Sequence, residues 1–129
     1  MAGVVVYLTL EQVLFIHEDQ IKRYGGSTGL RDIIMLESAV YRPQTTFNGE
    51  DLYDSLFEKA ASLFHSLLFN HPFVDGNKRT ALVSAIIFLE LNGIKMKKKQ
   101  QGMANMVTIM LMEHWDINKI TKWLKENYN

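Results

Sequence analysis

Apolar residues recur every three to four positions along most of this chain, which is the spacing of helices that bury one face. Thr9 and Gln12 have the spacing of a capping box, so a helix is predicted to start there and to end at Gly25-Gly26. Apolar residues surround the helical segment after Gly76 on nearly all sides, which predicts a buried central helix. The whole pattern predicts an all-α bundle, with further helices over residues 31–40, 54–69, 77–92, 100–113 and 117–127.

Residues 41–53 interrupt this helical period. Asn48-Gly49 is a turn signal, and Thr45, Thr46 and Phe47 before it favour extended backbone. We interpret the segment as a small hairpin or flap. A plain connecting loop explains the same residues, and the sequence alone leaves that alternative open.

Residues 71–80 gather chemically capable side chains between two helical segments. Pro72 and Gly76 prevent a continuous helix, because proline lacks a backbone donor and glycine favours unusual dihedral angles. A new helix is therefore expected to start at about Gly76, where free N–H groups and the positive dipole end form an anion site. Lys78 and Arg79 add formal positive charge at the same place.

Two further side chains of this segment suggest catalysis. His71 can accept a proton near neutral pH. Asp75 would repel a bare phosphate, so it is better suited to hold Mg²⁺ between its carboxylate and that phosphate. Together these groups suggest transfer of part of a nucleotide to a hydroxyl. The same residues also fit an ordinary helix–loop–helix connection, whereas a Walker A loop is disfavoured because its first glycine is missing.

The composition limits the other classes of protein. At 129 residues the chain is expected to form one domain over residues 1–129 with a proper core. Its net charge of zero gives no argument for nucleic acid, and the absence of cysteine excludes disulfide scaffolds and thiolate metal sites. The longest apolar stretch, residues 81–91, is interrupted by Ser84 and Glu90 and is too short to cross a membrane. We therefore expect a cytoplasmic protein with no membrane or nucleic-acid partner.

Residues 71–82 also resemble the signature of the Fic/Doc superfamily, in the form of its death-on-curing (Doc) toxin branch. Fic proteins have glycine where Lys78 stands and a second arginine where Leu82 stands, so this chain has the Doc version at both positions. The resemblance implies a compact helical bundle with a small β flap before the motif. It covers most of residues 7–93, including Gly25-Gly26-Ser27, Arg42-Pro43-Gln44 and Asn92-Gly93.

This resemblance implies a toxin that moves the γ-phosphoryl group of ATP to a Ser or Thr hydroxyl of a translation factor, expected to be elongation factor Tu. For such a transfer His71 would take the hydroxyl proton and Asp75 would hold Mg²⁺. Four residues would bind the phosphates through backbone amides or side chains, the Asn77 side chain included: Gly76, Asn77, Lys78 and Arg79. The resemblance also implies that the flap borders the site and aligns the target polypeptide, through Thr45, Thr46 and Phe47.

The implied partner is a Phd-like antitoxin, because the chain lacks the Ser/Thr-x-x-x-Glu-Gly/Asn inhibitory helix of self-silencing relatives. AMP transfer is the alternative reaction. Two substitutions argue against it, Lys78 in place of glycine and Leu82 in place of an arginine, because leucine cannot make the bidentate phosphate contact of an arginine. A non-catalytic RNA- or protein-binding module is the other alternative. It would use the basic run Lys95, Lys97, Lys98 and Lys99, which a solvated loop also explains. Three isolated histidines are assigned no chemistry: His17, His65 and His114.

Overall fold

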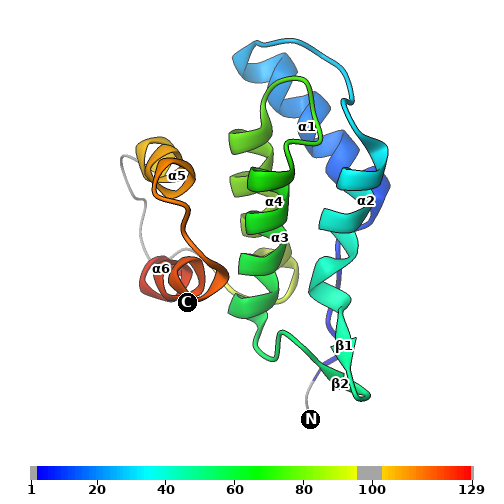
Figure 1. Cartoon of the computed structure of the whole chain (residues 1–129), viewed down its shortest axis with the longest axis vertical. Coiled ribbons are helices and arrows are strands. Elements are labelled where there is room, and N and C mark those ends of the chain that lie inside the picture. The colour runs from blue at the N-terminus through cyan, green and yellow to red at the C-terminus, as the bar shows by residue number, and fades with distance from the viewer. Residues whose placement is uncertain (1–2, 96–102, 129) are drawn as a thin grey trace.

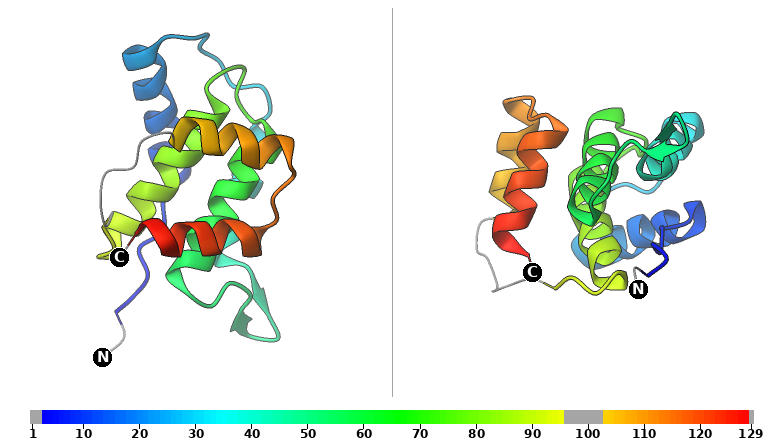
Figure 2. Two further views of the ribbon diagram at one scale, coloured as in Figure 1. Left: turned by 90° about the vertical axis from the view of Figure 1, so that its left-hand side faces the viewer. Right: turned by 90° about the horizontal axis from the view of Figure 1, so that it is seen from below.

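Six helices form three layers in the part of the chain that the computed structural model describes, residues 3–95 and 103–128 (Figure 1, Figure 2). The central layer consists of α3 and α4; α1 and α2 cover one side of it, and α5 and α6 cover the other. This arrangement confirms the predicted all-α bundle. The helices are α1 (Leu10–Tyr24), α2 (Ile33–Tyr41), α3 (Leu56–Asn70), α4 (Asn77–Leu91), α5 (Met103–Met112) and α6 (Ile117–Asn127), with a 3₁₀ turn η1 (Arg42–Gln44) after α2.

The ends of the helices follow from local sequence signals. In α1 the Gln12 N–H donates to Thr9 Oγ1 (3.1 Å) and the Thr9 N–H donates to Gln12 Oε1 (2.8 Å), which confirms the predicted capping box. A second capping box joins Ser55 and Glu58. It starts α3 at Leu56 rather than at the predicted residue 54, because the serine hydroxyl satisfies amides of the first turn.

The core confirms the predicted central position of α4. Its residues Ala81, Ala85, Phe88 and Leu89 are each at most 1% exposed, and Phe64 of α3 is fully buried as well. Three helices, α1, α3 and α5, pack against α4. Because α4 is held on several faces, the position of its first turn is fixed by the fold.

The predicted hairpin is present as β1 (Thr46–Phe47) and β2 (Glu50–Asp51), which pair in antiparallel register through Asn48-Gly49. Both turn residues have positive φ, 53° and 79°, as the tight hairpin turn requires. Lys59 of α3, only 1% exposed, donates to Asp51 Oδ2 (2.9 Å) and to the Tyr53 carbonyl. This buried ammonium group fixes the hairpin at the N-terminal end of α3 (Figure 1).

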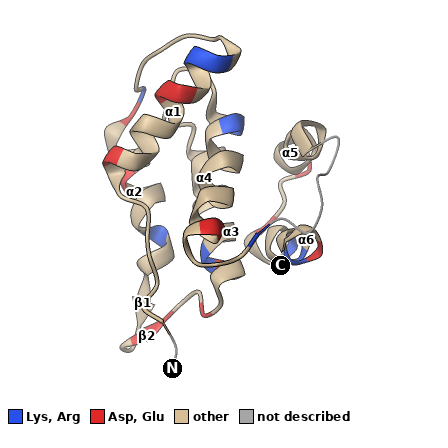
Figure 3. Ribbon diagram, turned by 180° about the vertical axis from the view of Figure 1, so that it is seen from behind, with Lys and Arg blue, Asp and Glu red and all other residues tan. Residues whose placement is uncertain are grey.

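Basic and acidic residues both occur on α1, α3, α4 and α6, whereas α5 has neither (Figure 3). Lys95 is described, whereas Lys97, Lys98 and Lys99 of the predicted basic run lie outside the described residues. Within the described ranges, no helix has the length and apolar character needed to cross a membrane.

Candidate active site

The loop of residues 71–76 joins the end of α3 to the start of α4, at the opposite end of the central layer from the hairpin (Figure 1). A second segment, residues 25–32, supports it, and we call this segment the support loop. The Val74 N–H donates to the Gly29 carbonyl (3.0 Å), and the N–H groups of Arg31 and Asp32 both donate to the Pro72 carbonyl (2.7 and 3.0 Å). The shape of the motif loop is therefore set by residues forty or more positions earlier in the chain.

Phe73 anchors the motif loop in the core. It is 2% exposed, and its ring stacks on the buried imidazole of His17 with centroids 3.8 Å apart and planes 4° apart. The Asn77 side chain accepts from the Phe73 N–H (3.0 Å) and donates to the Phe73 carbonyl (2.9 Å). The amide predicted to contact a phosphate is thus engaged with the loop, which leaves the backbone N–H of Asn77 for that contact.

The hydrogen bond of the exposed His71 ring selects one tautomer of its neutral form. Its Nδ1 lies 3.0 Å from the Leu68 carbonyl, which can only accept a hydrogen bond, so the neutral ring carries its proton on Nδ1. Nε2 then keeps its lone pair. The ring therefore has the tautomer that a general base at Nε2 requires.

The Asp75 carboxylate is exposed and held in place by two backbone amides. Oδ2 accepts from the Ser27 N–H (3.1 Å) and Oδ1 from the Gly76 N–H (2.8 Å). These hydrogen bonds, in that order, hold the pKa of Asp75 below its usual value, and the charges of Arg79 and His17 add to them. His17 also donates from Nε2 to the Asp75 carbonyl (2.8 Å). Backbone and side chain of Asp75 are thus both fixed, and the carboxylate stays ionised.

This donor set is compatible with Mg²⁺ bound together with a nucleotide. Within the described residues, no group of three or more His, Cys, Asp or Glu side chains could hold a metal by itself. Mg²⁺ is commonly bound by one or two carboxylates plus substrate phosphates and water. Each Asp75 oxygen accepts one hydrogen bond and retains a further lone pair for a metal.

The first turn of α4 has backbone donors without helical partners. Gly76 precedes it with a φ of 77°, and no side chain caps the helix. The first helical bond runs from the Thr80 N–H to the Gly76 carbonyl (3.0 Å), so the N–H groups of residues 77–79 have no acceptor in the helix. A β-carbon at residue 76 would lie 3.0 Å from Ile21 Cδ1, which explains why this turn needs glycine. These donors and the dipole end favour an anion.

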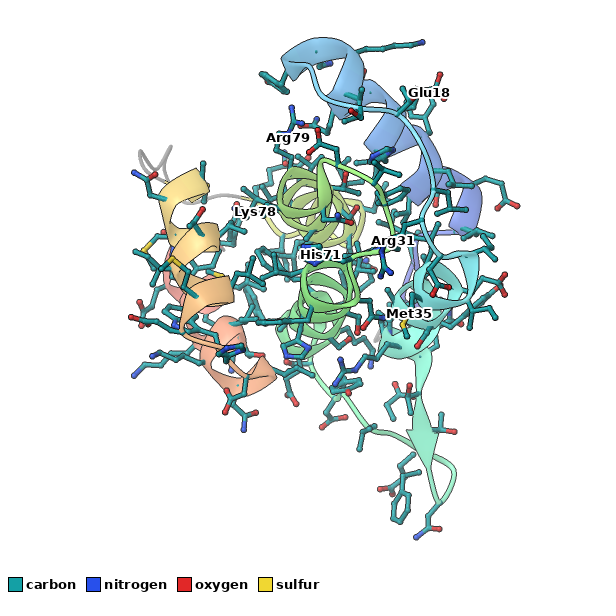
Figure 4. The ribbon with its side chains drawn as sticks, turned by 45° about the horizontal axis from the view of Figure 1, so that its top comes forward. Glu18, Arg31, Met35, His71, Lys78 and Arg79 are labelled. Atoms are coloured by element: carbon teal, nitrogen blue, oxygen red, sulfur yellow. The ribbon has the colours of Figure 1, made fainter. Side chains whose placement is uncertain are left out.

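Two cations flank this helix start. Lys78 is exposed and lies on the side of α4 that faces α5 (Figure 4). Arg79 is anchored at the C-terminal end of α1, where Nη2 donates to the Gly25 carbonyl (2.8 Å) and Nη1 to the Gln20 carbonyl (3.4 Å). Its guanidinium carbon also lies 5.9 Å from the centre of the Tyr24 ring. A guanidinium has five N–H donors, so donors remain for a phosphate.

The predicted residues of the motif loop and of the first turn of α4 meet in one cavity of about 370 Å³, which is large enough for a small ligand. Its polar wall contains His71 and the continuous segment 74–79. Its other wall comes from Leu82 and from the α5 residues Ala104, Val107 and Thr108. His71, the Asp75 carboxylate, the start of α4 and both cations therefore line one space.

Comparison with known proteins agrees with this geometry. A sequence profile of the Fic/DOC family matches residues 7–89, a range that contains the whole motif loop and the start of α4. The chain belongs to the Fic/DOC family.

Two Doc proteins are similar to this Fic/DOC chain. It is 49% identical over 73 residues to "Toxin Doc" of Mycolicibacterium smegmatis, a match that covers 57% of this chain and 56% of that protein. It is 37% identical over 89 residues to "Protein kinase doc" of Escherichia phage P1, which covers 69% of this chain and 70% of the phage protein. The chain thus spans little more than half of the length of the mycobacterial relative.

The hairpin does not have the position expected from the Fic/Doc resemblance. Thr45, Thr46 and Phe47 do not line the cavity, because the hairpin lies beside the first residues of α3 and His71 follows its last residue. Phe47 is 69% exposed and is free to contact another protein. Target alignment by the hairpin stays a prediction. In this arrangement, however, a target residue bound at the hairpin does not lie next to His71.

Three contributors to this Fic/DOC site were not predicted: His17, the support loop and α5. His17 had been assigned no chemistry because no second ligand stands at a helical spacing from it. Its partner Asp75 is 58 positions away, so only the fold brings the two together. The Gly25-Gly26-Ser27 run was the available signal for the support loop, since adjacent glycines indicate a special backbone path.

Proposed function

We propose that this chain is the toxin of a toxin–antitoxin module and that it transfers the γ-phosphoryl group of ATP to a Ser or Thr hydroxyl of a protein. One observation carries the proposal: His71, whose Nδ1 is bonded to the Leu68 carbonyl, lines the same cavity as the start of α4, which no side chain caps, and its two cations. The names of the two similar proteins, a toxin and a protein kinase, support it.

In the proposed reaction the acceptor hydroxyl oxygen forms a bond to the γ-phosphorus, and the bond between that phosphorus and the β,γ-bridging oxygen breaks to release ADP. His71 Nε2 accepts the proton that the hydroxyl loses. The backbone N–H groups of residues 77–79, with Lys78 and Arg79, hold the negative oxygens in place and neutralise their charge. Asp75 would hold Mg²⁺, which supplies additional positive charge to the phosphates.

The cavity wall favours phosphoryl transfer over AMP transfer. Leu82 lines the cavity at the position where Fic proteins have an arginine, so one bidentate phosphate contact is lost. With one bidentate phosphate contact fewer, the nucleotide is free to bind in another orientation that exposes the γ-phosphorus.

We further propose that the target is a translation factor, elongation factor Tu being the first to test, and that a Phd-like antitoxin neutralises the toxin in the cytoplasm. The exposed side of the motif loop leaves room for a macromolecular acceptor, because His71, Val74 and Asp75 are all exposed.

Parallel incubations with α-labelled and γ-labelled ATP test the reaction. The purified chain is mixed with Mg²⁺ and either a cell lysate or purified elongation factor Tu. We expect a protein band with the γ-label alone. A band that retains the α-label would establish AMP transfer, and a folded protein that gives no band with either label would refute both reactions.

A further inference from the structure

The end of α3 cannot be closed by its own backbone. His71 ends the helix in the left-handed conformation, with φ 50° and ψ 55°. Helices that end this way are usually closed by N–H groups of the next residues, which bond back to the last carbonyls. The next residue here is Pro72, which has no N–H. The last carbonyls of α3 therefore need donors from elsewhere.

Arg31 of the support loop supplies these donors. Its Nε donates to the His71 carbonyl (2.6 Å) and its Nη2 donates to the Asn70 carbonyl (2.8 Å). Its backbone N–H also donates to the Pro72 carbonyl (2.7 Å). A positive charge at the C-terminal end of a helix is favoured by the helix dipole as well. One residue thus holds three consecutive carbonyls around His71.

We infer that Arg31 is a positioning residue for His71, which keeps the imidazole Nε2 directed into the cavity. His71 makes its Nδ1 bond to the Leu68 carbonyl from a backbone in the left-handed conformation, so a change of that backbone would move the ring away from this carbonyl. Arg31 does not line the cavity, so it acts through His71 and not through the nucleotide. Figure 4 shows Arg31 and Lys78 on opposite sides of His71.

This inference deepens the proposed function, because it takes His71 as the acceptor of the hydroxyl proton. It predicts that Arg31→Gln lowers kcat by about 10²-fold, the loss expected when a reacting group is displaced by about 1 Å. KM for ATP and nucleotide affinity are expected to stay at wild-type values, because Lys78 and Arg79 are untouched. Arg31→Lys is expected to be intermediate, since a single ammonium group cannot reproduce the planar fork that reaches two carbonyls.

Arg23→Gln is the matched control. Arg23 is also an exposed arginine, paired with Asp19 on α1 at 2.8 Å, and it has no contact with the motif loop among the described residues. This variant should keep wild-type kcat and melting temperature.

Nitrogen-15 NMR of the His71 ring tests the inference without any transfer reaction. The neutral ring of the wild type is expected to carry its proton on Nδ1, and Arg31→Gln is expected to give a mixture of both tautomers. If the wild type transferred no group at all, the proposed function would fail, and the NMR result would still decide the role of Arg31.

Three results would overturn the inference. The first is a wild-type kcat in Arg31→Gln, and the second is an unchanged tautomer in that variant. The third is a parallel loss of kcat, nucleotide affinity and melting temperature in both Arg31 variants, which would show that Arg31 only supports the fold.

Discussion

Gly26 is a position where one methyl group reaches two functional side chains at once. Its φ is 118°, a backbone conformation that residues with a β-carbon rarely adopt. A β-carbon there would lie 2.7 Å from Asp75 Oδ2, 3.1 Å from Ile21 Cδ1 and 3.2 Å from Arg79 Nη2. Gly26→Ala therefore strains the backbone and also forces the carboxylate and the guanidinium to move.

The two effects have separate magnitudes. A residue held in a sparsely populated backbone region costs about 1–3 kcal/mol of stability. For a domain of this size each kcal/mol lowers the melting temperature by about 4 °C, so the expected loss is about 4–12 °C. Asp75 is the proposed Mg²⁺ ligand, so its displacement is expected to weaken the apparent Mg²⁺ affinity of nucleotide binding by about 10–100-fold, the range for changes next to a metal ligand.

Gly25→Ala is the control that separates backbone strain from displacement of the Asp75 and Arg79 side chains. Gly25 also has a positive φ, 84°, but a β-carbon there meets no atom within 4 Å. Both variants should therefore melt at lower temperature, and only Gly26→Ala should bind a fluorescent ATP analogue more weakly in a Mg²⁺ titration. Equal nucleotide binding by the two variants would refute the reasoning, since it would show that Asp75 and Arg79 do not depend on the space beside Gly26.

Three other predictions concern single side chains. His71→Ala should reduce the transfer rate by about 10²–10⁴-fold with nucleotide binding retained. The control His114→Ala, which removes another exposed histidine with positive φ (54°), should transfer at the wild-type rate. Equal transfer rates in the two variants would contradict the assignment of His71 as the base. The pKa of Asp75 is lowered, so its contribution to stability is fully present above the ordinary value of 3.8 and is lost as the pH falls through the lowered pKa. The melting temperatures of wild type and Asp75→Asn should therefore differ most above pH 3.8 and converge only as the pH falls through that lowered pKa. Burial, with a smaller effect of Glu90, raises the pKa of Tyr128 to about 12. The contribution of Tyr128 to stability is therefore complete below pH 10 and declines as the pH rises towards 12. Tyr128→Phe should flatten the dependence of the melting temperature on alkaline pH, and an unchanged dependence would contradict this.

The elements of the fold could be predicted because their signals are local. A capping box acts over three residues, as Thr9 and Gln12 show, and the apolar period that marks α4 extends over a few turns. The motif residues could be placed together for the same reason, since His71 to Arg79 are close in the chain and the backbone forces them to be neighbours in space.

The remaining parts of the site depend on contacts between distant segments, which a spacing pattern cannot show. His17 reaches Asp75 because α1 packs against α4, and the Ser27 amide reaches the same carboxylate from 48 positions away. The α5 wall, with Val107 and Thr108, arises from the packing of α5 on α4. The position of the hairpin was missed because its tether, Lys59, is a charged residue buried at a position where the pattern suggests solvent.

The hairpin and His71 lie at opposite ends of α3, so the length of α3 sets the minimum length of an acceptor polypeptide that contacts both. The helix has 15 residues, and at about 1.5 Å per residue it spans about 22 Å. An extended polypeptide advances about 3.3 Å per residue, so an acceptor needs about seven residues to touch the hairpin and His71 together. Free serine and very short peptides can reach only one of the two places. The predicted docking of the acceptor on the hairpin therefore requires that, in a series of peptides of increasing length, the transfer rate rises at the length that first bridges both ends of α3.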